Sequence, residues 1–202
     1  LNPGDSYRLA FVSSALTGAE FSDINVYNTF VNNLANSVTE LSALSLSWTA
    51  IVSTSAVHAR DNTNTNPGTS TGAPIYLLDG VTMIADDNAD LWDGGIDNPL
   101  NIDENGNVVA ATQAWTGTTA DGSGNLSNEL GSLNPITGAT NLSNFFWITL
   151  TSHARTTSWR MYAISDTITI PGGEPDIPEP GQLGLIAIGI IGFGIARRRI
   201  QR

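Results

Sequence analysis

The feature that most constrains this chain is an uncharged, apolar run near its C-terminus. It covers fourteen residues, 183–196, and is followed directly by Arg197, Arg198 and Arg199. A helix of that length spans about 21 Å, whereas the hydrocarbon core of a bilayer is about 30 Å thick. A buried core helix is the alternative, but a run that is apolar on every face and follows a proline-rich segment is more typical of a membrane helix. Residues 181–182 and the long arginine stems extend the span, so we expect one transmembrane helix at 183–196.

The residues on either side of this run predict how the chain is divided by the membrane. Positively charged residues stay on the cytoplasmic side, so residues 197–202 are expected to form a cytoplasmic tail. Residues 171–182 are rich in Pro and Gly and have no packing face, which predicts a semi-rigid spacer. Residues 1–170 then form an extracytoplasmic domain that is long enough to bury a hydrophobic core.

The expected membrane helix is rich in small residues. Small residues let a second helix approach closely, and they are also simply common in membrane helices, so the sequence leaves both explanations open. The first explanation predicts that the helix packs against other integral membrane proteins through Gly184, Ala187, Gly192, Gly194 and Ala196.

Composition excludes several classes of function. The chain has nineteen acidic residues against eight Arg and no Lys, for a formal net charge of −11. A surface this acidic repels phosphates, so we expect no nucleic acid partner. The absence of Cys excludes disulfides, thiolate catalysis and Cys-ligated metals. The chain begins with Leu1, as expected for an exported protein whose signal peptide has been removed.

The extracytoplasmic domain is predicted to be α+β, with one main helix, several short strands and unusually long loops. Helical spacing of apolar residues predicts a helix over 23–40, with Ser22 as its N-cap. Asp79-Gly80 favours a tight turn and therefore a hairpin between its flanking strands. The strands are expected at 7–13, 46–52, 75–78, 81–84, 145–151, 159–164 and 167–170, and the long loops at 61–72, 86–107 and 117–138.

Three features in order make the C-terminus recognisable. They are Pro178, Glu179 and Pro180, the short glycine-rich apolar run, and the terminal cluster Arg197–Arg199. Together they resemble the bacterial PEP-CTERM sorting signal. The resemblance implies export, recognition by a membrane exosortase, cleavage near the motif, and delivery to the surface or extracellular matrix of an exopolysaccharide-producing Gram-negative bacterium. Before processing, it implies an inner-membrane protein with its domain in the periplasm. A surface polysaccharide is then a further candidate partner.

A second resemblance covers about residues 7–171. It rests on a first strand, the helix that follows, and the segments PIYLLDG (74–80), DLWDG (90–94), AWTGTTADG (114–122) and FFWITLTSH (145–153). These resemble the endostatin-like branch of the C-type-lectin-like fold, which implies a small mixed sheet with long loops and one main helix. The cysteines of the animal members are missing, and the fold does not by itself assign a function.

Acidic residues are concentrated between Asp86 and Glu104, and this density has two explanations. Carboxylates at close spacing are often held by Ca²⁺, which takes six to eight oxygen ligands, or they form a solvated acidic surface. The segment 101–106 repeats the alternating oxygens and glycine turn of a calcium loop, but Thr112 stands where an EF-hand has Glu. The calcium alternative predicts a different loop geometry, with ligands Asp97, Asn101, Asp103 and Asn105, and we expect no other cofactor.

Two groups of residues have both a chemical and a structural explanation. Ser53 or Ser55 could form a hydrolase triad with His58 and Asp61, but no G-x-S-x-G elbow is present. A local loop anchor involving His58, Arg60 and Asp61 is favoured. The five Trp could stack on sugars, but anchoring a core without disulfides is the favoured role. They are Trp48, Trp92, Trp115, Trp147 and Trp159.

The sequence therefore predicts the cellular location of the protein more clearly than its activity. The leading hypothesis is a non-enzymatic, membrane-anchored protein that is sorted to the cell surface or extracellular matrix and has an interaction role there. The alternative is an accessory single-pass subunit of a larger membrane complex, whose acidic domain caps the external face. Retention of the intact chain among membrane subunits would distinguish the second hypothesis from the first.

Overall fold

The computed structural model describes residues 1–172, and residues 1–170 form one compact unit. The sorting-motif residues, the small residues Gly184–Ala196, the expected membrane helix and the arginine tail lie outside the described residues. Within residues 1–172, no helix combines the length and the apolar character needed to cross a membrane.

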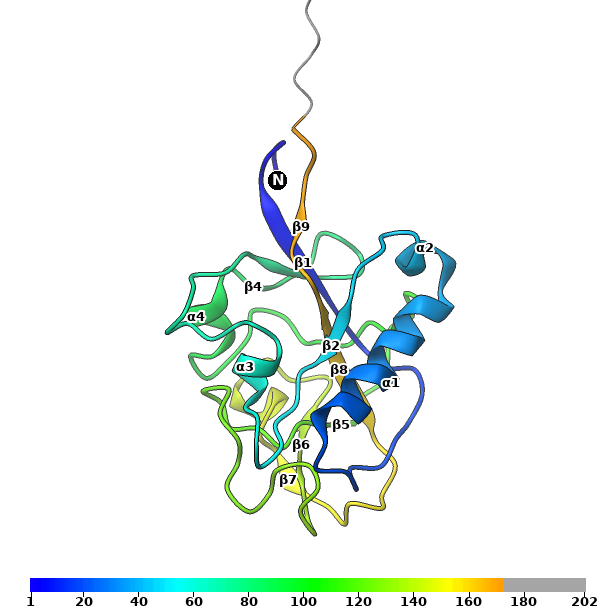
Figure 1. Cartoon of the computed structure of the whole chain (residues 1–202), viewed down its shortest axis with the longest axis vertical. Coiled ribbons are helices and arrows are strands. Elements are labelled where there is room, and N and C mark those ends of the chain that lie inside the picture. The colour runs from blue at the N-terminus through cyan, green and yellow to red at the C-terminus, as the bar shows by residue number, and fades with distance from the viewer. Residues whose placement is uncertain (173–202) are drawn as a thin grey trace, which may run out of the picture. The chain divides into compact units, whose positions relative to one another are not determined.

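The body is built around a mixed sheet whose centre is formed by the first long strand and a late one, β1 (Ser6–Val12) and β8 (Arg160–Ser165) (Figure 1). The strand order is β4-β3-β1-β8-β5-β6-β7, with β2 also paired to β8 and β9 paired to β1. The β1–β3 and β5–β8 pairs are parallel, and the other pairs are antiparallel. The remaining strands are β2 (Trp48–Ala50), β3 (Ile75–Leu77), β4 (Met83–Ala85), β5 (Gln113–Trp115), β6 (Ile136–Ala139), β7 (Thr151–Ser152) and β9 (Ile168–Thr169).

Helices are few, which confirms the α+β class. The main helix is α1 (Ile24–Ser37), and short turns of helix lie at α2 (Thr39–Ser42), α3 (Ala59–Asn62), α4 (Asn88–Leu91) and the 3₁₀ helix η1 (Phe145–Trp147). A mixed sheet with one main helix and long loops agrees with what the second resemblance implies in general terms. Assignment to the endostatin-like branch stays a prediction.

Each face of the sheet is covered by its own hydrophobic core, because successive strand residues point to opposite faces. In β1, Leu9 and Phe11 join the core beneath α1, together with Tyr27 and Val31 of that helix. The alternate residues Ala10 and Val12 join the other core, where α4 and the long loops provide the cover. This two-sided burial explains why β1 and β8 read as continuous apolar runs in the sequence.

The main helix is shorter than the predicted 23–40 and has a different cap. Asp23, and not Ser22, is the N-cap, and its side chain accepts a hydrogen bond from the Asn25 backbone amide (3.0 Å). Val38 has extended backbone angles and ends the helix, after which α2 begins as a separate turn that buries Leu41. The prediction of one continuous helix to residue 40 is therefore wrong in its last turn.

The predicted strand over 145–151 is also wrong. The segment begins with η1, because the Asn144 side chain accepts from the Phe146 amide (3.2 Å) and starts a helical turn that buries Trp147. Only Thr151–Ser152 pairs as a strand. Two strands were not predicted: β5 was assigned to no element, and β6 begins inside the loop expected at 117–138.

The hairpin prediction around Asp79-Gly80 is confirmed, although its second strand starts two residues later than expected. Asp79 Oδ1 accepts from the backbone amides of Val81 and Thr82, and Gly80 has a φ of +71°. Partial burial raises the pKa of Asp79, but the hydrogen bonds from Thr82 and Val81 outweigh it, so the pKa is lowered. The charged side chain therefore stabilises the turn at neutral pH.

The two ends of the compact unit lie side by side. The strands β1 and β9 form a two-stranded ribbon that projects from the body (Figure 1), and hydrogen bonds extend it to Gly4 and Ile170. The point at which the chain continues toward residue 171 is thus held next to the N-terminal residues.

Candidate functional site

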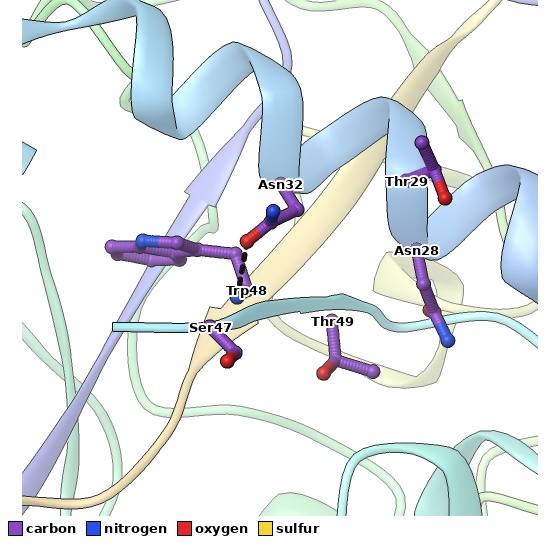
Figure 2. A pocket seen from close by; sticks show the side chains of 6 residues that line it. All are labelled: Asn28, Thr29, Asn32, Ser47, Trp48 and Thr49. Carbon is purple, nitrogen blue, oxygen red and sulfur yellow. Dashed lines mark hydrogen bonds between the residues drawn. The ribbon is translucent and has the colours of Figure 1, made fainter. Parts of the chain in front are cut away.

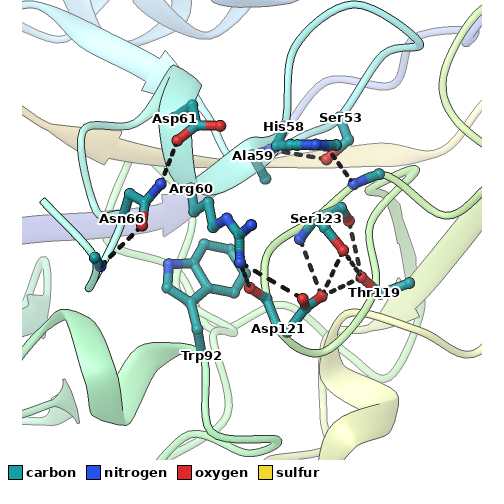
Figure 3. A network of polar contacts seen from close by, with 12 residues as sticks. Ser53, His58, Ala59, Arg60, Asp61, Asn66, Trp92, Thr119, Asp121 and Ser123 are labelled. Atoms are coloured by element: carbon teal, nitrogen blue, oxygen red, sulfur yellow. Dashed lines mark hydrogen bonds and ion pairs between the residues drawn. The ribbon is translucent and has the colours of Figure 1, made fainter.

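The predicted loop anchor around His58 exists, but with other partners than expected (Figure 3). His58 Nδ1 accepts from the Gly124 amide (2.8 Å), which requires the neutral ring to carry its proton on Nε2. Arg60 pairs with Asp121 and not with Asp61, at 3.5 Å between Arg60 Nη1 and Asp121 Oδ2. These contacts fasten the loop around residues 119–124 to α3.

Asp121 is the acidic member of this anchor. Partial burial raises its pKa, but hydrogen bonds from Ser123 and Thr119 outweigh that effect, and the charge of Arg60 adds to them, so the pKa falls to about 2. Gly122 follows with a φ of +79°, and a Cβ there would lie 2.7 Å from the Trp92 ring. The loop therefore packs directly on Trp92, which agrees with the expected role of Trp92 as an anchor of the core.

The candidate hydrolase triad is not assembled. Ser53 Oγ accepts from the Ala59 amide (2.8 Å) and from Thr118 Oγ1 (3.0 Å), so its hydrogen bonds are to the loop anchor. His153 Nε2 contacts Gln113 Oε1 at 2.7 Å. In the part of the chain that the structure describes, neither histidine shares a hydrogen bond with a serine, so no serine there has an adjacent base to activate it.

Four of the five Trp are core residues, which confirms the structural interpretation for them. Trp115 and Trp147 are completely buried, and Trp48 and Trp92 are 2% and 5% exposed. Trp92 Nε1 donates to Thr65 Oγ1 (2.9 Å) and Trp115 Nε1 to the Thr17 carbonyl (3.0 Å). Trp159 is partly exposed, beside the ring of His153. None of the four buried rings offers a face to a sugar.

The predicted calcium ligands fall into two different surroundings. Asp103 is buried, and its Oδ1 accepts from the Asn105 and Asn107 amides (3.0 and 2.9 Å) at the tip of a small hairpin closed by the Ile102–Val108 bridge. The Asn101 carbonyl accepts from Val109 at the base of the same hairpin. The carboxylate of Asp103 thus has a structural role in the turn.

Asp97 belongs to another acidic group. Desolvation together with the charges of Asp90, Asp87 and Asp97 raises the pKa of Asp86. Among residues 1–172, no three acidic or histidine side chains are arranged so that they could hold a metal ion. The calcium site therefore stays a prediction, and the acidic group forms a charged patch at the surface.

The structure also has a pocket between α1 and β2 that the sequence does not predict (Figure 2). It has a volume of about 270 Å³ and is lined by Asn28, Thr29 and Asn32 of α1 and by residues 47–49. Asn32 Oδ1 accepts from the Trp48 amide (3.0 Å), and Asn28 Oδ1 accepts from the Ala50 amide (3.0 Å). The side chains of Asn28 and Asn32 thus accept hydrogen bonds from the backbone N–H groups of β2 that do not pair with β8. These contacts cover a sheet edge that would otherwise be open.

Comparison with protein families finds a match at the C-terminal end of the chain. A family described as the PEP-CTERM protein-sorting motif matches residues 176–199, which include Pro178, Glu179, Pro180 and Arg197–Arg199. This confirms the first resemblance: the chain carries the C-terminal sorting signal of an exported bacterial protein, linked to the exosortase processing machinery of the membrane. No curated protein matches the chain, so the second resemblance gains no support from relatives.

Proposed function

We propose that this chain is a non-enzymatic, membrane-anchored protein that the sorting signal directs to the cell surface or extracellular matrix, where its acidic body has an interaction role. The observation that carries the proposal is the order of parts along the chain: a compact unit ends at residue 170, and the matched motif begins at residue 176. In that order, cleavage near the motif would release the body whole.

The distribution of charge supports an interaction role at a surface. Residues 1–172 contain sixteen Asp and Glu but only four Arg. All four guanidinium groups donate to backbone carbonyls of the body: Arg8 to Ser165 and Thr63, Arg60 to Asp121, Arg155 to Gly131, and Arg160 to Ser13 and Ser14. Because the cations cross-link the fold and most acids face solvent, the body presents negative charge to its partners.

Arg8 shows this structural use of arginine most clearly. It is 6% exposed, and its Nε and Nη1 donate to the carbonyls of Ser165 (2.7 Å) and Thr63 (2.8 Å). Burial lowers the pKa of Arg8 to about 10, and the charge of Asp166 opposes this effect. The side chain is therefore charged at neutral pH, and it joins β1, β8 and the segment after α3.

A motif variant tests the sorting proposal. In an exosortase-containing Gram-negative host, we expect the parent chain to reach the surface or medium shortened at its C-terminus, and Pro178→Ala combined with Glu179→Ala to leave the full-length chain in the inner membrane. Pro175→Ala, which lies just before the matched residues, is the control and should behave as the parent. Equal distribution of all three proteins between inner membrane and surface would refute the proposal.

The accessory-subunit alternative is favoured by the small residues Gly184, Ala187, Gly192, Gly194 and Ala196. Such residues would allow close packing against helices of a larger complex. This alternative requires that the full-length chain co-purifies with specific membrane subunits in a neutral detergent, and that Gly192→Leu disrupts the association. Recovery of the chain from the medium without its C-terminal segment would exclude it.

A further inference from the structure

A second groove lies at the opposite end of α1 from its N-cap, and its chemistry is different from that of the α1–β2 pocket. It has a volume of about 200 Å³. Its apolar walls are Val38, Leu41 and Leu78, which come from the end of α1, from α2 and from the hairpin after β3. We call it the Glu40–Glu104 groove, because these two carboxylates line it together with Asn105 and Gly106.

Glu104 is an unusual residue for such a wall, because it is only 4% exposed. Its Oε2 accepts from the Ser14 amide (2.8 Å), and its Oε1 accepts from Ser14 Oγ and from Asn105 Nδ2 (3.4 Å). All of these donors are neutral. Arg160 lies nearby, but it donates to the Ser13 and Ser14 carbonyls, and Arg60–Asp121 is the one ion pair within 4 Å among residues 1–172.

A buried carboxylate without an ion-pair partner favours the approach of a cation, because burial weakens its solvation and strengthens its Coulomb interaction. Glu40 adds a second, exposed carboxylate to the same groove. The apolar walls in turn favour an aliphatic chain. The best complement to the groove is therefore a positive group at the end of a hydrocarbon stem, which is the chemistry of an arginine or lysine side chain.

We propose that the Glu40–Glu104 groove is a docking site for one basic side chain of a partner protein, with the stem on Leu41 and Leu78 and the charged end between the two carboxylates. The cation must come from outside the body, because its four arginines are used as described above and the chain has no Lys. This inference rests on the interaction role proposed above and assigns it a partner chemistry: a protein surface with an exposed Arg or Lys.

The test uses the full chain in neutral detergent and butylguanidinium as the probe, with butylurea as its uncharged analogue. Backbone amide NMR shifts of Leu41, Asn105 and Gly106 should change with butylguanidinium in a saturable way, with a Kd of about 1–10 mM for so small a ligand. Butylurea should cause much smaller changes at the same concentration. Glu40→Gln should raise the Kd about threefold to fivefold, because it removes one exposed ion pair and the free energy that such a pair contributes.

The matched control is Glu20→Gln, which removes the same charge from an exposed site outside the groove. It should leave the Kd unchanged. An equal weakening by Glu20→Gln would mean general attraction to an acidic surface, and equal shifts with butylurea would mean apolar binding alone; either result, or no saturable shift, overturns the proposal. Because binding is measured on purified protein, its failure is independent of where the sorting experiment finds the chain.

Discussion

The amide network between α1 and β2 leads to a quantitative prediction for Asn28→Ala. Asn28 Oδ1 accepts from the Ala50 amide and from Asn62 Nδ2, and Asn28 Nδ2 donates to Asn62 Oδ1 (2.9 Å). Ala50 is completely buried, so its amide would lose its partner at a cost of about 1–3 kcal/mol. The loss of the amide pair with Asn62 adds about 1 kcal/mol, and the better helix propensity of Ala returns about 0.6 kcal/mol. We expect the free energy of unfolding to fall by about 1.5–3.5 kcal/mol.

Asn33→Ala is the matched control for this change. Asn33 lies in the same helix but is exposed, and its side chain makes no hydrogen bond among the described residues. The same substitution there should be neutral or should stabilise by about 0.5 kcal/mol. Urea unfolding of the full chain, followed by the fluorescence of the buried Trp, measures both variants. A difference of less than about 1 kcal/mol between them would refute the role assigned to the network.

Three further predictions concern the body. Gly138→Ala would place a Cβ 1.8 Å from the Trp147 carbonyl oxygen, so the free energy of unfolding should fall by more than about 3 kcal/mol. The control Gly172→Ala has open space around the added Cβ and should change the free energy of unfolding by less than about 0.5 kcal/mol. The Asp121 pKa of about 2 lies below its unfolded value of 3.8, so the stabilisation by the charged carboxylate is complete above pH 4 and is lost as the pH falls toward 2. Since the side chain is 61% exposed, this stabilisation amounts to about 1 kcal/mol. Asp121→Asn should therefore flatten the pH dependence of the free energy of unfolding in that window, and an unchanged slope would contradict the role assigned to Asp121. Because Asp103 already accepts two backbone hydrogen bonds, millimolar Ca²⁺ added after chelation should leave the Tm unchanged within about 1 °C, and a rise of several degrees would favour the calcium loop.

The sequence predicted elements well where local chemistry decides them. The first strand, the main helix and the Asp79-Gly80 hairpin each have a signal within a few residues, and the structure confirms all three with shifted ends. Ser22 and Asp23 can both cap a helix, and the sequence does not indicate which of them has the backbone geometry of an N-cap. In the structure the N-cap is Asp23. Val38 has extended backbone angles and ends the helix early, and the separate turn that follows buries Leu41.

Elements that depend on distant partners were not predictable in the same way. The strand β5 has three residues, and it is a strand only because it pairs with β6 and β8, far away in the sequence. The η1 turn replaced a strand because Asn144 caps it, although the run FFWITL is rich in strand-forming residues.

The candidate sites show the same limit. The role of Arg60 as a loop anchor was predicted, but its acidic partner was not, because Asp61 is adjacent in sequence and Asp121 only in space. The α1–β2 pocket and the Glu40–Glu104 groove each join segments that are separated along the chain. The sorting motif, by contrast, was recognisable from sequence because its signal is a local order of residue types.

The mass of the protein recovered from the cell surface tests the account most directly. We predict a species whose C-terminus lies near Pro178–Pro180, with the compact body complete and without Arg197, Arg198 and Arg199. The same cells without the exosortase should instead hold the chain with its arginine tail in the membrane fraction. Recovery of a full-length chain from the surface, with an unchanged mass in both strains, would contradict the account.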